Sequence, residues 1–180
     1  RSCFVIMEYK FLKDNPVTIL QLVKPEITKK YYEIVVGNDR YASIDLLHDE
    51  GTLVRLETAG ASYTIKRMGF FLPYVTLRKD KDVEDLAMSK LNLNGKSTIT
   101  LNGNRYSFTH FDLWKNQWAW LNDKNKFIIK YKLTTEGPLR GQIEVSKDAF
   151  YNGDLELLMA LGSYYLLQLD DELFRQNELK

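Results

Sequence analysis

Short runs of β-branched and aromatic residues, separated by turn signals, fill the chain from Phe4 to about Ser146. Pairs such as Asn102-Gly103 supply the positive φ that tight hairpins require. Apolar and polar residues alternate within several runs, which is typical of an antiparallel sheet with one buried face. The expected strands are Tyr31–Val36, Arg40–Leu47, Thr52–Glu57, Ser62–Arg67, Thr98–Leu101, Arg105–Phe111 and Phe127–Leu133.

The last part of the chain has a different pattern. The run Leu155–Leu169 is apolar on nearly every side of a helical wheel. It predicts a helix over about residues 154–170, with Asp154 as N-cap and Glu156 in the first turn. A helix that is apolar all round must be surrounded by protein. The acidic residues at 170–172 are unfavourable near a helix C-terminus, so they mark its expected end.

Many short strands followed by one apolar helix predict a mainly β fold. We expect a closed antiparallel barrel of about 12 strands around a central hydrophobic C-terminal α-helix, forming a single domain over residues 1–180. The small residues Ala160, Gly162 and Ser163 would let barrel side chains approach the middle of the helix. The helix should fill the lumen, so a ligand-carrying barrel is not expected.

Composition limits the class of protein and its compartment. The chain has 180 residues, of which 44% are hydrophobic, and a net charge of +1, so a nucleic-acid partner is not expected. The single cysteine, Cys3, excludes an intrachain disulfide and fits a reducing cytoplasm. The apolar start is too short for a signal peptide, and residues 155–169 are too few for a membrane span. We expect a cytoplasmic monomer, with membrane association only through its surface.

Candidate residues for catalysis or metal binding are few. His48 and His110 are the only histidines, and neither belongs to an HExxH pair. Gly95-Lys96-Ser97 lacks the upstream glycine of a phosphate-binding loop, and the acids of 80–84 lack the glycine of a calcium loop. No acid, base and nucleophile can be named together, so we expect no enzyme, no metal and no cofactor.

Three tryptophans form an aromatic cluster. Trp118 and Trp120 lie on one face of a predicted strand, and Trp114 precedes them. Outward indoles could stack on a ligand or lie at a membrane interface. Because a barrel of this size needs bulky interior residues, the core position is favoured.

The chain resembles the tubby C-terminal-like superfamily, which includes tubby proteins, phospholipid scramblases, plant LURP-one-related proteins and small bacterial relatives. The resemblance rests on three segments: Ser62–Phe70 resembles a central strand and turn, Asn102–Phe108 a later hairpin, and Gly153–Leu167 the terminal helix. It implies a 12-stranded barrel around a C-terminal helix, as in a small bacterial-type member. In several relatives it also implies membrane or phosphoinositide binding.

Basic residues on predicted strands give the candidate ligand-binding positions. They are Lys66, Arg67, Arg78, Lys79, Lys130 and Lys132. A local cationic patch attracts anionic head groups by about 1 kcal/mol per residue near the surface. The leading hypothesis is a non-enzymatic module that binds anionic phospholipid head groups or membrane surfaces. The alternatives are a protein-interaction or scaffold domain without a small ligand, and, for these residues, an ordinary solvated face.

Overall fold

The computed structural model describes residues 8–47, 52–69, 71–92, 96–112 and 116–178, with the helix side chains described as far as residue 169. Within these ranges, twelve strands precede a short 3-10 helix, η1, and the helix α1. Their bounds are β1 Ile19–Val23, β2 Tyr31–Val36, β3 Asp39–Leu46, β4 Leu53–Thr58, β5 Ser62–Met68, β6 Tyr74–Lys79, β7 Ala87–Lys90, β8 Ser97–Leu101, β9 Asn104–Asp112, β10 Gln117–Leu121, β11 Phe127–Glu136, β12 Leu139–Val145, η1 Lys147–Ala149 and α1 Leu155–Glu178.

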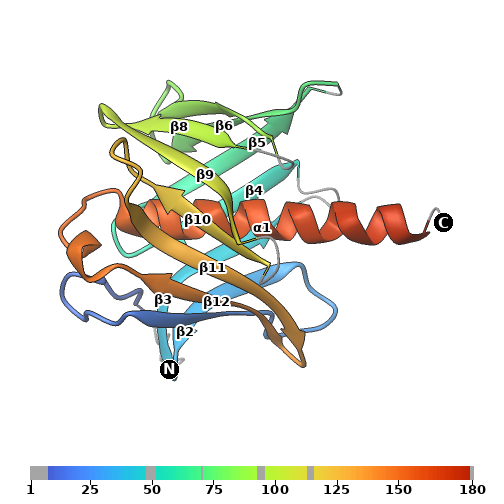
Figure 1. Ribbon diagram of the computed structural model, residues 1–180, viewed down its shortest axis with the longest axis horizontal. Coiled ribbons are helices and arrows are strands. Elements are labelled where there is room, and N and C mark those ends of the chain that lie inside the picture. The colour runs from blue at the N-terminus through green and yellow to red at the C-terminus, as the bar shows by residue number, and fades with distance from the viewer. Residues whose placement is uncertain (1–7, 48–51, 70, 93–95, 113–115, 179–180) are drawn as a thin grey trace, which may run out of the picture.

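The strands form one antiparallel sheet that wraps into a nearly closed barrel, which confirms the predicted fold class (Figure 1). Its hydrogen-bonded order is β7-β6-β5-β4-β3-β2-β1-β12-β11-β10-β9-β8. Side chains join the edge strands β7 and β8: Ser89 Oγ donates to the Thr98 carbonyl over 2.8 Å. Just beyond β7, the main-chain N–H of Asn92 donates to Ser97 Oγ over 2.9 Å. The seam is therefore held by hydroxyl groups where the rest of the barrel uses a backbone ladder.

The helix α1 runs through the barrel and packs against β3, β4, β10 and β11. Every residue from Leu157 to Leu169 is buried, as the all-round apolar pattern predicts. The helix is longer than the predicted 154–170, because it continues to Glu178 and leaves the barrel at its C-terminal end (Figure 1). The acids at 170–172 follow the buried part without ending the helix. They are several residues from its C-terminus, so the unfavourable dipole term is small.

Two barrel side chains contact the backbone of α1 at a notch around Gly162. Trp120 Nε1 donates to the Leu158 carbonyl over 2.8 Å, and the Tyr131 hydroxyl donates to the same oxygen over 3.0 Å. A Cβ on Gly162 would lie 2.3 Å from the Tyr131 hydroxyl oxygen. The glycine is therefore required for the close approach. Trp118 is also buried, so the core interpretation is confirmed for it and for Trp120, while Trp114 lies outside the described residues.

Polar contacts attach the start of α1 to the barrel. Asp154 occupies the N-cap position, but its buried carboxylate accepts hydrogen bonds from Asn102 Nδ2 over 2.8 Å and from the Tyr106 hydroxyl over 2.6 Å. Burial, together with this bond to a carboxylate, raises the pKa of Tyr106 to about 12. Glu156 Oε1 accepts from the Leu12 amide over 2.9 Å, which ties the N-terminal segment to the helix.

Candidate functional site

The structure separates the four predicted basic residues of β5 and β6 into two pairs. Lys66 and Arg78 are exposed and point outward from the sheet. Arg67 lies two residues after the buried Ile65 and therefore on the same, inner face of β5. Its Nη1 donates to Gln168 Oε1 of α1 over 2.6 Å. Lys79 likewise has the parity of the buried inner positions, although it is exposed at the end of its strand. Arg67 and Lys79 are therefore not part of the outer face that carries Lys66 and Arg78.

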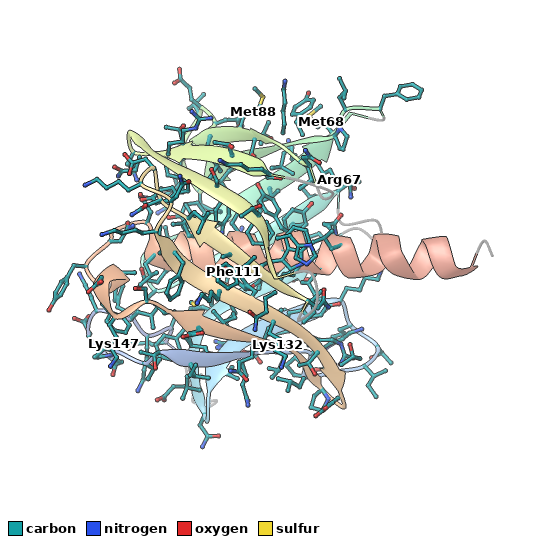
Figure 2. The ribbon with its side chains drawn as sticks, viewed as in Figure 1. Arg67, Met68, Met88, Phe111, Lys132 and Lys147 are labelled. Atoms are coloured by element: carbon teal, nitrogen blue, oxygen red, sulfur yellow. The ribbon has the colours of Figure 1, made fainter. Side chains whose placement is uncertain are left out.

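Lys130 and Lys132 lie on β11, away from β5 and β6. Lys130 Nζ stacks over two rings, 4.0 Å from the centroid of Phe127 and 4.6 Å from that of Phe111. Figure 2 shows Lys132 on the opposite side of the barrel from Met68, which ends β5. The six predicted residues therefore do not converge on one patch, and their role in ligand binding remains a prediction.

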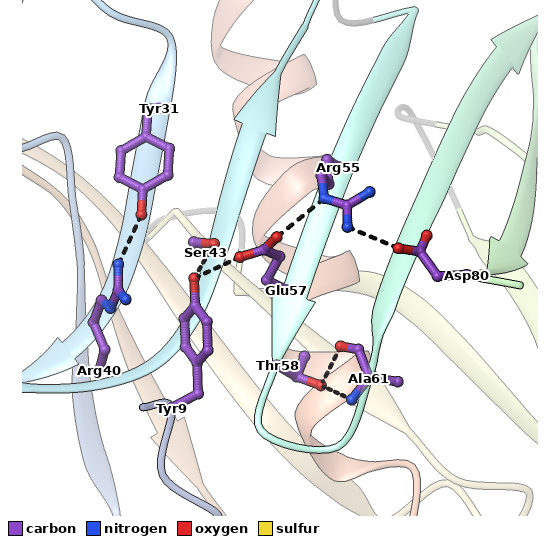
Figure 3. Close-up of polar contacts among 9 residues, drawn as sticks. All are labelled: Tyr9, Tyr31, Arg40, Ser43, Arg55, Glu57, Thr58, Ala61 and Asp80. Atoms are coloured by element: carbon purple, nitrogen blue, oxygen red, sulfur yellow. Dashed lines mark hydrogen bonds and ion pairs between the residues drawn. The ribbon is translucent and has the colours of Figure 1, made fainter. Parts of the chain in front are cut away.

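Acidic partners neutralise much of the cationic charge on the outer face of β3–β6 (Figure 3). Arg55 contacts Glu57 over 3.0 Å and Asp80 over 2.7 Å, and Arg78 contacts Asp85 over 3.0 Å. Ion pairs of this kind reduce the attraction that an arginine can exert on an external anion.

The N-terminal segment covers part of the same sheet. The Tyr9 hydroxyl contacts Ser43 Oγ at 2.7 Å and donates to Glu57 Oε2 over 3.1 Å (Figure 3). Burial raises the pKa of Tyr9. The Arg40 guanidinium lies 4.5 Å from the Tyr9 ring centroid and pairs with Glu33. The outer face of β2–β4 is therefore occupied by polar contacts within the chain.

Apolar side chains are exposed at the turn between β5 and β6. Phe71 and Leu72 are 89% and 81% exposed. Gly69 begins the turn with φ +83°, and a Cβ there would lie 2.6 Å from the Leu72 carbonyl oxygen. Met68 and Met88 continue the apolar surface onto the outer faces of β5 and β7, with 49% and 66% exposure.

Two lysines flank this apolar turn. The register places Lys66 opposite Thr76, which lies opposite Met88, while Lys90 lies opposite Tyr74. Neither lysine forms an ion pair with any residue that the structure describes. We define the β5–β7 surface as Lys66, Met68, Phe71, Leu72, Met88 and Lys90. A groove of about 370 Å³ adjoins this surface and shares Lys66 and Met68 with it. Its lining residues are Thr64, Lys66, Met68, Thr76, Arg78 and Asp85.

This surface combines exposed apolar groups with unpaired positive charge. Apolar side chains at a turn tip suit the acyl boundary of a bilayer, and flanking lysines suit the phosphates above it. Of these residues, only Lys66 is predicted from the sequence as a binding residue. The apolar stretch between Gly69 and Pro73 is a signal that could have revealed the rest, because turns are usually polar.

The remaining candidates for catalysis or metal binding are the two histidines and the acidic residues. His110 stacks on Trp118 with ring centroids 4.3 Å apart, and His48 lies outside the described residues. The described residues hold no group of three or more His, Cys, Asp or Glu side chains placed to bind a metal ion. Among the described residues, no helix is both long and apolar enough to cross a membrane.

Comparison with known proteins gives no family assignment. No protein-family model matches the chain, and neither a curated protein nor a solved structure matches it. Membership of the tubby C-terminal-like superfamily therefore remains a proposal, as does any function that the resemblance implies.

Proposed function

We propose that the protein is a non-enzymatic barrel module that binds anionic membrane surfaces through the β5–β7 surface. The observation that carries this proposal is the pairing of Phe71 and Leu72, exposed at one turn, with Lys66 and Lys90 beside them. The resemblance to the tubby C-terminal-like superfamily supports the same function.

The apolar residues and the lysines of the β5–β7 surface would contact different parts of a bilayer. Phe71 and Leu72 would enter the acyl boundary, where burial of apolar area is favourable. Lys66 and Lys90 would remain among the phosphates, each contributing about 1 kcal/mol on an anionic surface. A net charge of +1 makes this attraction local, so binding should require anionic lipid and weaken with salt.

Vesicle co-sedimentation tests this function. The protein should pellet with phosphatidylcholine vesicles that contain phosphatidylserine, and much less with phosphatidylcholine alone. Lys66→Gln with Lys90→Gln should weaken binding about 30-fold, since two contributions of about 1 kcal/mol are lost.

A matched control separates the site from net charge. Lys130→Gln with Lys132→Gln removes the same charge from β11 and should leave vesicle binding nearly unchanged. Equal recovery of the unmodified protein with neutral and anionic vesicles at low salt would refute membrane binding. Equal loss in both double variants would instead refute the β5–β7 surface as its site.

A protein-interaction function is the second candidate, because exposed methionines adapt to varied partners. Met68 and Met88 favour it, since both side chains are exposed on the outer face of the sheet. In that case Phe71→Ser with Leu72→Ser would abolish capture of a protein partner, while the unmodified protein would not pellet with vesicles.

A further inference from the structure

A second hollow lies on the opposite side of the barrel from the β5–β7 surface. Its volume is about 700 Å³. Figure 2 shows one of its residues, Lys147, far from Met68 and Met88. Its lining residues come from the segment before β1, from β1 itself, and from η1 and the loop that follows: Lys13, Pro16, Val17, Thr18, Ile19, Lys147, Phe150 and Tyr151.

The two walls of the hollow are tied to the barrel. The Val145 amide donates to the Thr18 carbonyl over 2.8 Å, and the Ser146 amide donates to the Ile128 carbonyl over 2.9 Å. Val17 and Phe150 pack against the hydrophobic core. The hollow is therefore formed largely before a ligand arrives, which lowers the ordering cost of binding.

The lining combines apolar side chains with two lysines. Tyr151 is 93% exposed beside the partly buried Phe150, so its ring is available for stacking. Among the residues that the structure describes, the lining includes no acidic side chain. Lys13 Nζ lies 5.1 Å from the Phe11 ring centroid, and neither Lys13 nor Lys147 forms an ion pair with a described residue.

We propose that this hollow binds a small organic anion with an apolar body, such as a carboxylate or sulfonate carried by an aromatic or alkyl group. The lysines would contact the anionic group, while Phe150, Tyr151 and Ile19 would cover the apolar body. This proposal is independent of membrane binding, because it uses no residue of the β5–β7 surface.

Titration with 8-anilinonaphthalene-1-sulfonate, followed by its fluorescence, tests the proposal on the full chain. The unmodified protein should show saturable one-site binding. Lys13→Gln with Lys147→Gln should weaken that binding about tenfold, which corresponds to about 1.4 kcal/mol for the two exposed charge contacts together. Tyr151→Ser should weaken it as well, with the thermal unfolding temperature unchanged.

Lys66→Gln with Lys90→Gln is the matched control, since it removes the same charge from the β5–β7 surface. It should leave the affinity unchanged. The uncharged probe N-phenyl-1-naphthylamine should bind both double variants equally. Equal affinities of the sulfonate for the two double variants, or a larger loss in the control, would overturn the proposal.

Discussion

Gly162→Ala is expected to lower the free energy of unfolding by about 2–4 kcal/mol, because the new methyl group overpacks the core and disturbs buried hydrogen bonds. A Cβ at this position would lie 2.3 Å from the Tyr131 hydroxyl oxygen and 2.5 Å from Trp120 Nε1. Both groups donate to the Leu158 carbonyl, so neither ring can move away without weakening a buried bond.

The direction of this change in stability distinguishes Gly162 from a glycine in an ordinary helix interior. In an ordinary helix interior, alanine in place of glycine stabilises by about 1 kcal/mol. The midpoint of thermal unfolding should instead fall by about 5–15 °C for a chain of this size. Gly153→Ala is the matched control, because a Cβ there meets no atom within 4 Å. An unchanged or higher midpoint for Gly162→Ala would contradict the contact between α1 and the two rings.

Leu158→Asp is expected to abolish cooperative folding. Leu158 is 0% exposed and lies where the barrel contacts the helix backbone. An unpaired carboxylate at this position would cost several kcal/mol, in addition to the lost packing, out of a total stability of about 5–15 kcal/mol. Circular dichroism and thermal melting should show loss of the native transition.

The control for this variant keeps the volume and removes the charge. Leu158→Met should cost less than about 1.5 kcal/mol, because the two side chains are similar in size. Truncation after Gly153 should also prevent folding, since it removes the helix that the strands enclose. A soluble Leu158→Asp protein that melts like the unmodified one would show that the helix is not enclosed.

Alternation and turn chemistry were enough to predict the barrel. Tyr31–Val36 is exact as a predicted strand, and the other six predicted strands overlap observed ones. Asn102 and Gly103 have φ of +49° and +81°, as a tight hairpin requires. The buried helix was predictable because a segment without a polar face has only one stable environment. Its C-terminal end was not, since charged residues can continue a helix once it has left the core.

The candidate surface was only partly predictable from the sequence. Lys66 and Arg67 are neighbours on one strand, so their side chains point to opposite faces of the sheet and do not form one patch. That Lys66 and Lys90 lie on the same outer face depends on the pairing of β5, β6 and β7, which a single sequence does not determine. Nor does composition reveal that Arg78 is neutralised by Asp85.

The most direct test of membrane binding asks which part of the protein enters the bilayer. In a Cys3→Ser background, Leu72→Cys would carry an environment-sensitive nitrobenzoxadiazole label, and Ile27→Cys would be the control because Ile27 is 87% exposed in another loop. Anionic vesicles should shift the emission of the label at 72 to the blue and leave that at 27 unchanged. A shift at 27 alone, or at neither position while the protein pellets with vesicles, would contradict binding through the β5–β7 surface.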